Sequence, residues 1–232
     1  MPEWWSYSLS DFLLFSPRTY YRLIERYNEA VWPAQIATLA LGLGCLALLR
    51  RKVWVQGRII SGILAVLLAW VAGAFLWRRY TTINWAAVYV LPLFALQIVL
   101  LVWIGVVRNR LTFQVSRGFT GVAGSAMLGF SVIAYPLVAP VLGRGWLQAE
   151  IFGIAPDPTV IGTAGLLLLT GRARWGLLAV PVAWCLVSAL TLWAMNSPEV
   201  VVPAAAAITV VTAAGFNSQK VERQRELVDD YR

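Results

Sequence analysis

The sequence lacks histidine altogether, has only 2 cysteines, and carries charge on only 13% of its 232 residues. Without histidine, the chain loses the usual ligand of haem b and zinc and the usual base of serine-dependent proteolysis. Its apolar stretches hold no Asp, Glu, Lys or Arg, except for Glu199 at the start of the last one. Intramembrane acid/base, redox and ion-coupled chemistry needs such groups. We therefore expect no enzyme activity, no cofactor and no metal site.

The composition is that of an integral membrane protein, because 59% of the residues are hydrophobic and soluble domains carry about 25% charged residues. Seven apolar segments occupy residues 30–49, 59–77, 85–107, 119–142, 158–171, 175–195 and 198–216. The fifth has 14 residues, or about 21 Å of helix, against a hydrocarbon layer of about 30 Å. The sequence predicts an all-α polytopic membrane bundle of seven transmembrane helices, with a short fifth span.

The basic residues divide unequally between the two sides of such a bundle. One side receives 13 of the 19 Lys and Arg, and the other side receives 6. The 13 are Arg50, Arg51, Lys52, Arg58, Arg108, Arg110, Arg117, Arg172, Arg174, Lys220, Arg223, Arg225 and Arg232. The positive-inside rule places this side in the cytoplasm, so the N-terminus is predicted outside and the C-terminus inside. The basic excess reflects topology, and we expect no nucleic acid as a partner.

The N-terminal segment has no signal peptide pattern, and residues 17–27 are amphipathic. Tyr20, Leu23, Ile24 and Tyr27 recur at helical spacing on one face, while charged residues occupy the other. We expect this helix to lie on the outer surface of the bilayer. The predicted organisation is an interfacial segment at 1–29, the transmembrane bundle at 30–216 and a cytoplasmic tail at 217–232.

Four polar residues are the candidates for ligand binding at the outer face: Asn28, Glu29, Gln35 and Asp157. Pro33 donates no hydrogen bond to the carbonyl of Glu29, which leaves a free acceptor beside the first three. The alternative is that Asn28 and Glu29 only cap a helix. Asp157 precedes Pro158, as at an ordinary helix start, but the short fifth span would draw its carboxylate below the surface, where it needs a partner or a function.

Small residues indicate two faces where a membrane protein partner or a neighbouring helix can approach. Gly121, Ser125 and Gly129 form a stripe on the fourth span, and residues 204–207 of the seventh are all Ala. The outer amphipathic helix is a further candidate surface for a partner. Cys45 and Cys185 lie at different predicted depths, so we expect neither a disulfide nor a two-cysteine metal site.

Four segments resemble a family of small bacterial multi-pass inner-membrane proteins of unknown function. They are RYNEAVWPAQ (26–35), GVVRNRLTF (105–113), FGIAPDPT (152–159) and VPVAWCLVSALTLWAM (180–195). The resemblance implies a location in the bacterial inner membrane, and it implies no activity, substrate or catalytic residue. Asn28, Glu29 and Asp157 fall within two of these segments.

The sequence as a whole favours a non-enzymatic membrane protein that binds a small solute, ion or lipid in an outward-facing cavity, as a transporter or channel component does. The alternative is a scaffold or accessory subunit of a larger membrane protein complex. Binding predicts that Glu29 and Asp157 are needed for the ligand, whereas a subunit predicts stable co-purifying proteins. The lipid bilayer is the partner that both hypotheses share.

Overall fold

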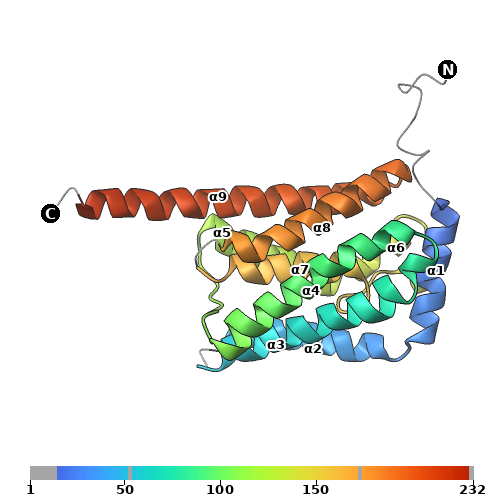
Figure 1. The fold of residues 1–232 in the computed structure, drawn as a ribbon, viewed down its shortest axis with the longest axis horizontal. Coiled ribbons are helices and arrows are strands. Elements are labelled where there is room, and N and C mark those ends of the chain that lie inside the picture. Colours follow the sequence, from blue (N-terminus) through green and yellow to red (C-terminus); the bar gives the residue numbers. More distant parts are fainter. Residues whose placement is uncertain (1–14, 52–53, 172–173, 230–232) are drawn as a thin grey trace, which may run out of the picture.

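The computed structural model of the chain describes residues 15–51, 54–171 and 174–229, and the side chains of 217–229 lie outside this description. The described ranges are helical and contain no strand. Long helices run side by side along the bundle, while α1 (Pro17–Ala30) lies across one end (Figure 1). The all-α fold is therefore as predicted.

The remaining α-helices are α2 (Ala34–Leu49), α3 (Gln56–Trp70), α4 (Leu91–Leu100), α5 (Phe119–Gly129), α6 (Val138–Val141), α7 (Pro156–Leu168), α8 (Trp175–Ala194) and α9 (Val201–Asp229). Turns of π-helix continue α3, α4 and α5 as η3 (Val71–Trp77), η6 (Leu101–Val107) and η7 (Phe130–Ala134). Turns of 3-10 helix are η4 (Tyr80–Thr82), η5 (Trp85–Val90), η8 (Tyr135–Leu137), η9 (Trp146–Gln148) and η10 (Pro198–Val200).

Five helical runs in the described chain are long and apolar enough to cross a membrane: 56–82, 85–107, 119–141, 175–194 and 198–216. A sixth is added if α1 and α2 are counted as one span, although the two helices are bent by 90°. Helix α7, at the predicted fifth span, has only 13 residues and is not among them. The structure supports five or six such helices, and seven spans remain a prediction.

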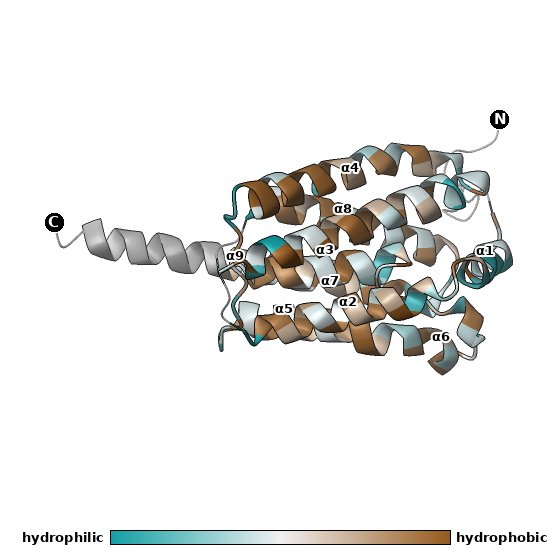
Figure 2. Ribbon diagram, turned by 90° about the horizontal axis from the view of Figure 1, so that it is seen from below, coloured by the Kyte–Doolittle hydropathy of each residue, from teal (hydrophilic) through white to brown (hydrophobic). Residues whose placement is uncertain are grey.

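The outer surface of the bundle is apolar. Large hydrophobic side chains project outward along the helices, with Val66, Ile133 and Ile208 each more than 60% exposed. Hydrophobic residues cover the lengths of the helices and hydrophilic ones gather at their ends and on α1 (Figure 2). An exposed apolar band of this kind is costly in water and suits a lipid environment.

Helix α7 forms the centre of the bundle, since all 13 of its residues are buried. It packs most closely against α5, where a Cβ built at Gly124 would lie 2.6 Å from the carbonyl oxygen of Gly165. This contact does not involve the predicted small-residue stripe of Gly121, Ser125 and Gly129. A Cβ at Gly129 would meet nothing within 4 Å, and one at Gly121 would meet Ser116 of the preceding loop. Within the chain, Gly124 rather than that stripe makes the helix contact.

Helix α1 begins as the sequence predicts and extends further than predicted, to Ala30 rather than residue 27. Ser16 caps it by accepting a hydrogen bond from the Thr19 backbone at 3.2 Å. Its buried face carries Tyr20, Ile24 and Tyr27, so the amphipathic pattern is satisfied by packing across the end of the bundle.

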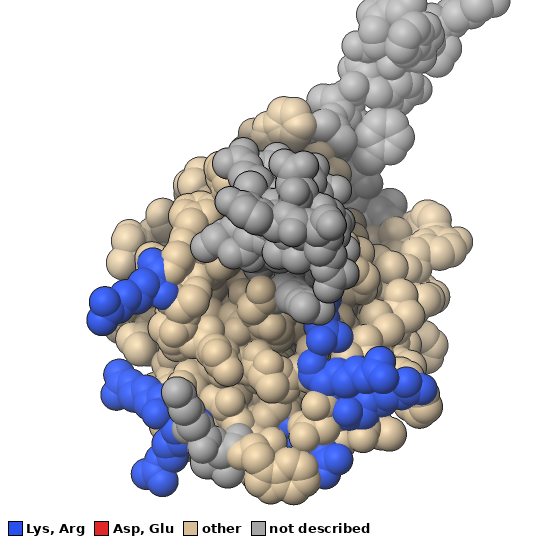
Figure 3. Space-filling model, turned by 90° about the vertical axis from the view of Figure 1, so that its left-hand side faces the viewer, with Lys and Arg blue, Asp and Glu red and all other residues tan. Residues whose placement is uncertain are grey.

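Charge is distributed unequally between the two ends of the bundle. At the end where α2 gives way to α3, the described charged side chains are arginines: Arg50, Arg51, Arg58, Arg108, Arg110, Arg117 and Arg174. Viewed from this end, Lys and Arg ring the bundle and no Asp or Glu is visible among the described side chains (Figure 3). The acidic residues whose side chains are described belong to α1, α7, η10 and the loop before α7.

Candidate functional site

A non-helical segment, residues 149–155, leads into the bundle and ends where α7 begins. All of its residues are buried except the half-buried Ile151. Gly153 makes the turn with φ 81°, where a Cβ would lie 2.7 Å from Cβ of Thr38 and 2.9 Å from Cδ2 of Leu67. Only glycine fits this conformation and this close approach. The segment delivers the carboxylates of Glu150 and Asp157 to the interior.

The Asp157 carboxylate is 2% exposed and accepts hydrogen bonds from three side chains. Trp184 Nε1 donates to Oδ1 at 2.7 Å, and Ser188 Oγ donates to Oδ2 at 2.6 Å. The Tyr135 hydroxyl also donates to Oδ2, at 3.4 Å. These donors come from α8 and η8, so three segments of the chain converge on this carboxylate.

Asp157 lies deep in the bundle. Its partners Trp184 and Ser188 are ten and six residues from Ala194, the last residue of α8, which is about 15 Å and 9 Å of helix. The carboxylate therefore lies between the middle of α8 and its C-terminal end. Because the cost of an ionised carboxylate at such depth is high, a residue of this kind in a membrane protein is a functional candidate.

Glu150 is the second buried acid, with 6% of its surface exposed. The Tyr20 hydroxyl donates to its Oε1 at 3.4 Å, and its Oε2 has no hydrogen-bond partner among the described residues. Burial, reinforced by the nearby charge of Asp157, raises the pKa of Glu150 from 4.5 to about 8. At neutral pH this side chain can therefore hold a proton.

A cavity of about 210 Å³ lies between the residues that contact these two acids. Its walls come from α1, η3, η4, η5, α7 and α8, at the end of the bundle crossed by α1. Aromatic rings of Tyr20, Phe75, Tyr80 and Trp184 line it, together with the hydroxyl-bearing residues Ser188 and Thr191. Tyr20 connects the cavity to Glu150, and Trp184 and Ser188 connect it to Asp157.

No arginine in the described part of the chain forms an ion pair with either buried acid. The ion pair found there joins Arg144 to the buried Glu199, beside Tyr21. Two carboxylates thus stand behind an aromatic-walled cavity without an ion-pair partner among the described residues, while Arg144, paired with Glu199, acts on Glu150 only as a nearby charge that lowers its pKa. Such a site suits a cation, because carboxylates attract it and aromatic faces stabilise it.

The structure separates the four predicted ligand residues. Asn28 Nδ2 donates to the carbonyls of Leu147 and Ala149, both at 2.8 Å, and Gln35 Nε2 donates to the Asn28 carbonyl at 2.7 Å. These two residues therefore support the backbone before Glu150. Glu29 is exposed, and Asp157 alone of the four lies beside the cavity.

Four residues of the site were not predicted from the sequence: Glu150, Tyr20, Trp184 and Ser188. In the sequence, Glu150 lies in a predicted outer loop, where an acidic residue is expected to be exposed. Its burial depends on the path of the segment that follows it. Trp184 and Ser188 are four residues apart in α8, so they share one helix face. That spacing indicates that the two side chains lie together, but it does not identify Asp157 as the residue that they contact.

Metal ligation has no support in the described residues, which contain no group of three or more His, Cys, Asp or Glu placed to hold an ion. Cys45 and Cys185 are both buried and free. Their place in the structure is within the packed core, as small apolar side chains.

The comparisons with known proteins identify a family and no function. The chain belongs to a family of unknown function, DUF6064, which matches residues 18–224. This match covers all four of the segments on which the family resemblance was based, and it leaves out only residues 15–17 and 225–229 of the described chain. No curated protein and no solved structure matches the chain.

Proposed function

We propose that the protein is a non-enzymatic component of the bacterial inner membrane that binds a small organic cation in the cavity beside Asp157. The observation that carries this proposal is the burial of Asp157 and Glu150 without an ion-pair partner among the described residues, next to a cavity lined by aromatic rings. A transporter or channel component is the kind of protein that needs such a site.

The chemistry of the walls favours a small ligand with a positive charge. A volume of about 210 Å³ is below the roughly 300–1,000 Å³ of sites for drug-sized molecules. Tyr and Trp faces attract ammonium groups, and Ser188 and Thr191 offer hydroxyl oxygens. A protonated Glu150 would lower the charge of the empty site and would release its proton when a cation binds.

The proposed orientation places the cavity on the outer side of the membrane. The end where α2 gives way to α3 lies opposite α1 (Figures 1 and 3). In the sequence, 13 of the 19 Lys and Arg fall on its side, and the positive-inside rule assigns that side to the cytoplasm. The cavity, which lies at the α1 end, would then open outward, as would the N-terminus of α1.

The test uses the full chain in a mild neutral detergent, with tetramethylammonium as the probe and calorimetry as the measurement. Asp157→Asn should lose about 10-fold or more in affinity, as expected when a charge interaction is removed. Glu29→Gln removes an exposed carboxylate at the same end of the bundle and is the matched control. Ser188→Ala is a second variant, which alters the wall and keeps the acid.

Two results would contradict the proposal. One is the absence of tetramethylammonium binding by the unaltered chain, and the other is equal affinity in Asp157→Asn, Ser188→Ala and Glu29→Gln. Size-exclusion profiles establish which variants are folded before their affinities are compared.

The alternative of an accessory subunit is favoured by a different observation. Helix α9 has 29 residues and continues past the end of the bundle where α2 gives way to α3 (Figure 1). A helix that leaves its own bundle can pack against another protein. Co-purification of one stable protein at a fixed ratio, lost on removal of residues 217–232, would favour this function.

A further inference from the structure

A second pocket lies on the other side of α1 and is lined by arginines. Arg18, Arg22 and Arg26 follow one another at intervals of four residues on α1, which puts them on one helix face. Arg78 and Arg79, which follow η3, lie across from them. The pocket has a volume of about 410 Å³.

The lining of this pocket is basic and hydroxyl-bearing. It consists of Arg18, Thr19, Arg22, Leu23, Arg26, Arg78, Arg79, Thr82 and Ile83. No Asp or Glu is among these residues, and none of the five arginines is in an ion pair within the described chain. Like charges four residues apart destabilise a helix, so the row on α1 carries a cost that a bound anion would remove.

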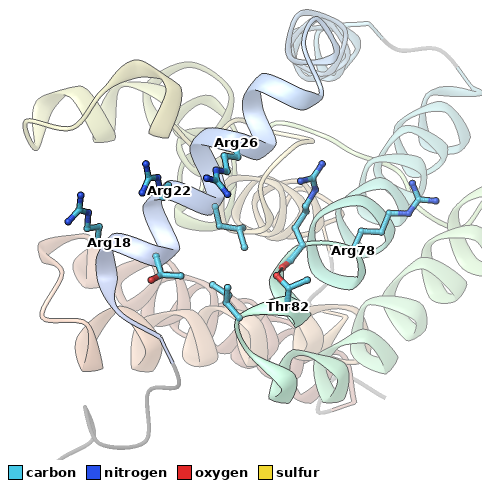
Figure 4. Close-up of a pocket in the computed structure, with 9 residues that line it drawn as sticks. Arg18, Arg22, Arg26, Arg78 and Thr82 are labelled. Atoms are coloured by element: carbon cyan, nitrogen blue, oxygen red, sulfur yellow. Dashed lines mark hydrogen bonds between the residues drawn. The ribbon is translucent and has the colours of Figure 1, made fainter.

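Figure 4 shows how the two sides of the pocket face each other. Arg18, Arg22 and Arg26 stand in a row along α1, and Thr82 lies on the facing segment. Arg78 comes from that same segment and borders the pocket, and its side chain extends away from α1.

The row is held in place by the opposite face of α1. Tyr20, Ile24 and Tyr27 are buried against the bundle, and the Tyr27 hydroxyl accepts a hydrogen bond from Trp70 Nε1 at 3.1 Å. A helix anchored in this way presents its arginines in a fixed direction. The pocket is thus a built feature of the fold.

Exposed tryptophans at the same end of the bundle indicate the depth of the pocket relative to a membrane. Trp77 directly precedes Arg78 and is 57% exposed, and Trp32 and Trp85 at the same end are 66% and 62% exposed. Tryptophans concentrate at the headgroup level of a bilayer. Arginines at this level meet phosphate groups, which the planar guanidinium binds through paired hydrogen bonds.

We propose that the arginine pocket of α1 and η4 binds a phosphate-bearing anion. Phospholipid headgroups and free phosphomonoesters share this chemistry, and both fit a pocket within the roughly 300–1,000 Å³ of small-molecule sites. The site is separate from the cavity beside Asp157 and does not depend on the function proposed for that cavity.

The experiment compares two arginine pairs in the full chain, purified in a mild neutral detergent. Arg22→Gln with Arg26→Gln removes two charges from the pocket, and Arg50→Gln with Arg51→Gln removes two from the opposite end of the bundle as the matched control. The probes are glycerol 3-phosphate, measured by calorimetry, and phosphatidylglycerol, measured as adducts retained in native mass spectrometry.

The pocket pair should lose about 10-fold or more in affinity for the probe that binds, as expected for lost charge-assisted hydrogen bonds, while the control pair changes less than about 2-fold. Binding of glycerol 3-phosphate identifies a free phosphomonoester as the source, and binding of phosphatidylglycerol alone identifies a lipid. If the first pair does not fold, Arg18→Gln with Arg79→Gln removes one arginine from each side of the pocket and tests it in the same way.

Two outcomes overturn the proposal. If the pocket pair and the control pair lose affinity equally, binding reflects general attraction to a basic protein. If the unaltered chain binds neither probe, the pocket is no phosphate site. Arg22→Lys with Arg26→Lys keeps the charge and removes the paired geometry, so it should bind more weakly than the unaltered chain and better than the Gln pair.

Discussion

The contact between α5 and α7 leads to a prediction in which two alanine substitutions in one helix have opposite effects. At Gly124, the new Cβ would lie 2.6 Å from the Gly165 carbonyl oxygen and 3.0 Å from Cδ2 of Leu169. The oxygen belongs to the backbone of α7, so it moves only if the helices separate. At Gly129, the new Cβ would meet nothing within 4 Å.

The magnitude follows from two effects. Replacing Gly by Ala in a helix gains about 0.5–1 kcal/mol in both variants. Overpacking costs about 1–3 kcal/mol and applies only to Gly124→Ala. Gly124→Ala should therefore be less stable than Gly129→Ala by about 1–3 kcal/mol. At roughly 2–4 °C for each kcal/mol in a chain of this size, the Tm values should differ by about 2–12 °C.

The assay is thermal unfolding of both variants in detergent, followed by intrinsic tryptophan fluorescence. A Tm for Gly124→Ala equal to or above that of Gly129→Ala would refute the close packing of α5 on α7. Because α7 carries Asp157, Gly124→Ala should also weaken tetramethylammonium binding, and Gly129→Ala should leave it unchanged.

Two further predictions concern the acids at the α1 end. The folded chain holds the Glu150 proton up to a pKa of about 8, whereas the unfolded chain releases it near 4.5, so thermal stability should fall as pH rises between these values. Glu150→Gln should flatten this dependence in Tm measurements from pH 5 to 8, and an unchanged slope would show that another group is responsible. Glu199→Gln removes the charge that is paired with Arg144. Because the side chains of Glu199 and Arg144 are only 8% and 15% exposed, this substitution should lower the free energy of unfolding by about 1–3 kcal/mol. Glu29→Gln, at an exposed position, is the control and should leave the Tm unchanged.

Features that depend on local composition were predictable from the sequence. Basic residues stop the apolar runs, so the predicted end of the first span at residue 49 matches the end of α2 at Leu49. The predicted start of the amphipathic helix at residue 17 likewise matches the start of α1 at Pro17. Both rest on interactions within a few residues of the chain, where the pattern and the structure have the same cause.

Features that depend on long-range packing were not predictable. The short apolar run at 158–171 indicates a weak span, and the structure makes it the fully buried centre of the bundle. Periodicity does not separate a helix surrounded by protein from one that faces lipid, since both are apolar all round. In the same way, several small-residue lines run along α5, and only the tertiary fold selects Gly124 for the contact with α7.

The segments that resemble the family acquire a common physical role in the fold. Non-helical backbone inside a bundle needs internal partners for its polar groups, and the segment before α7 obtains them from two of these motifs. Asn28, in RYNEAVWPAQ, donates to the Leu147 and Ala149 carbonyls. Thr159, in FGIAPDPT, accepts from the Gly153 amide at 2.7 Å and donates to the Ala155 carbonyl at 2.6 Å. The motifs hold open a break in helical structure, and that break is what allows two carboxylates to enter an otherwise apolar bundle.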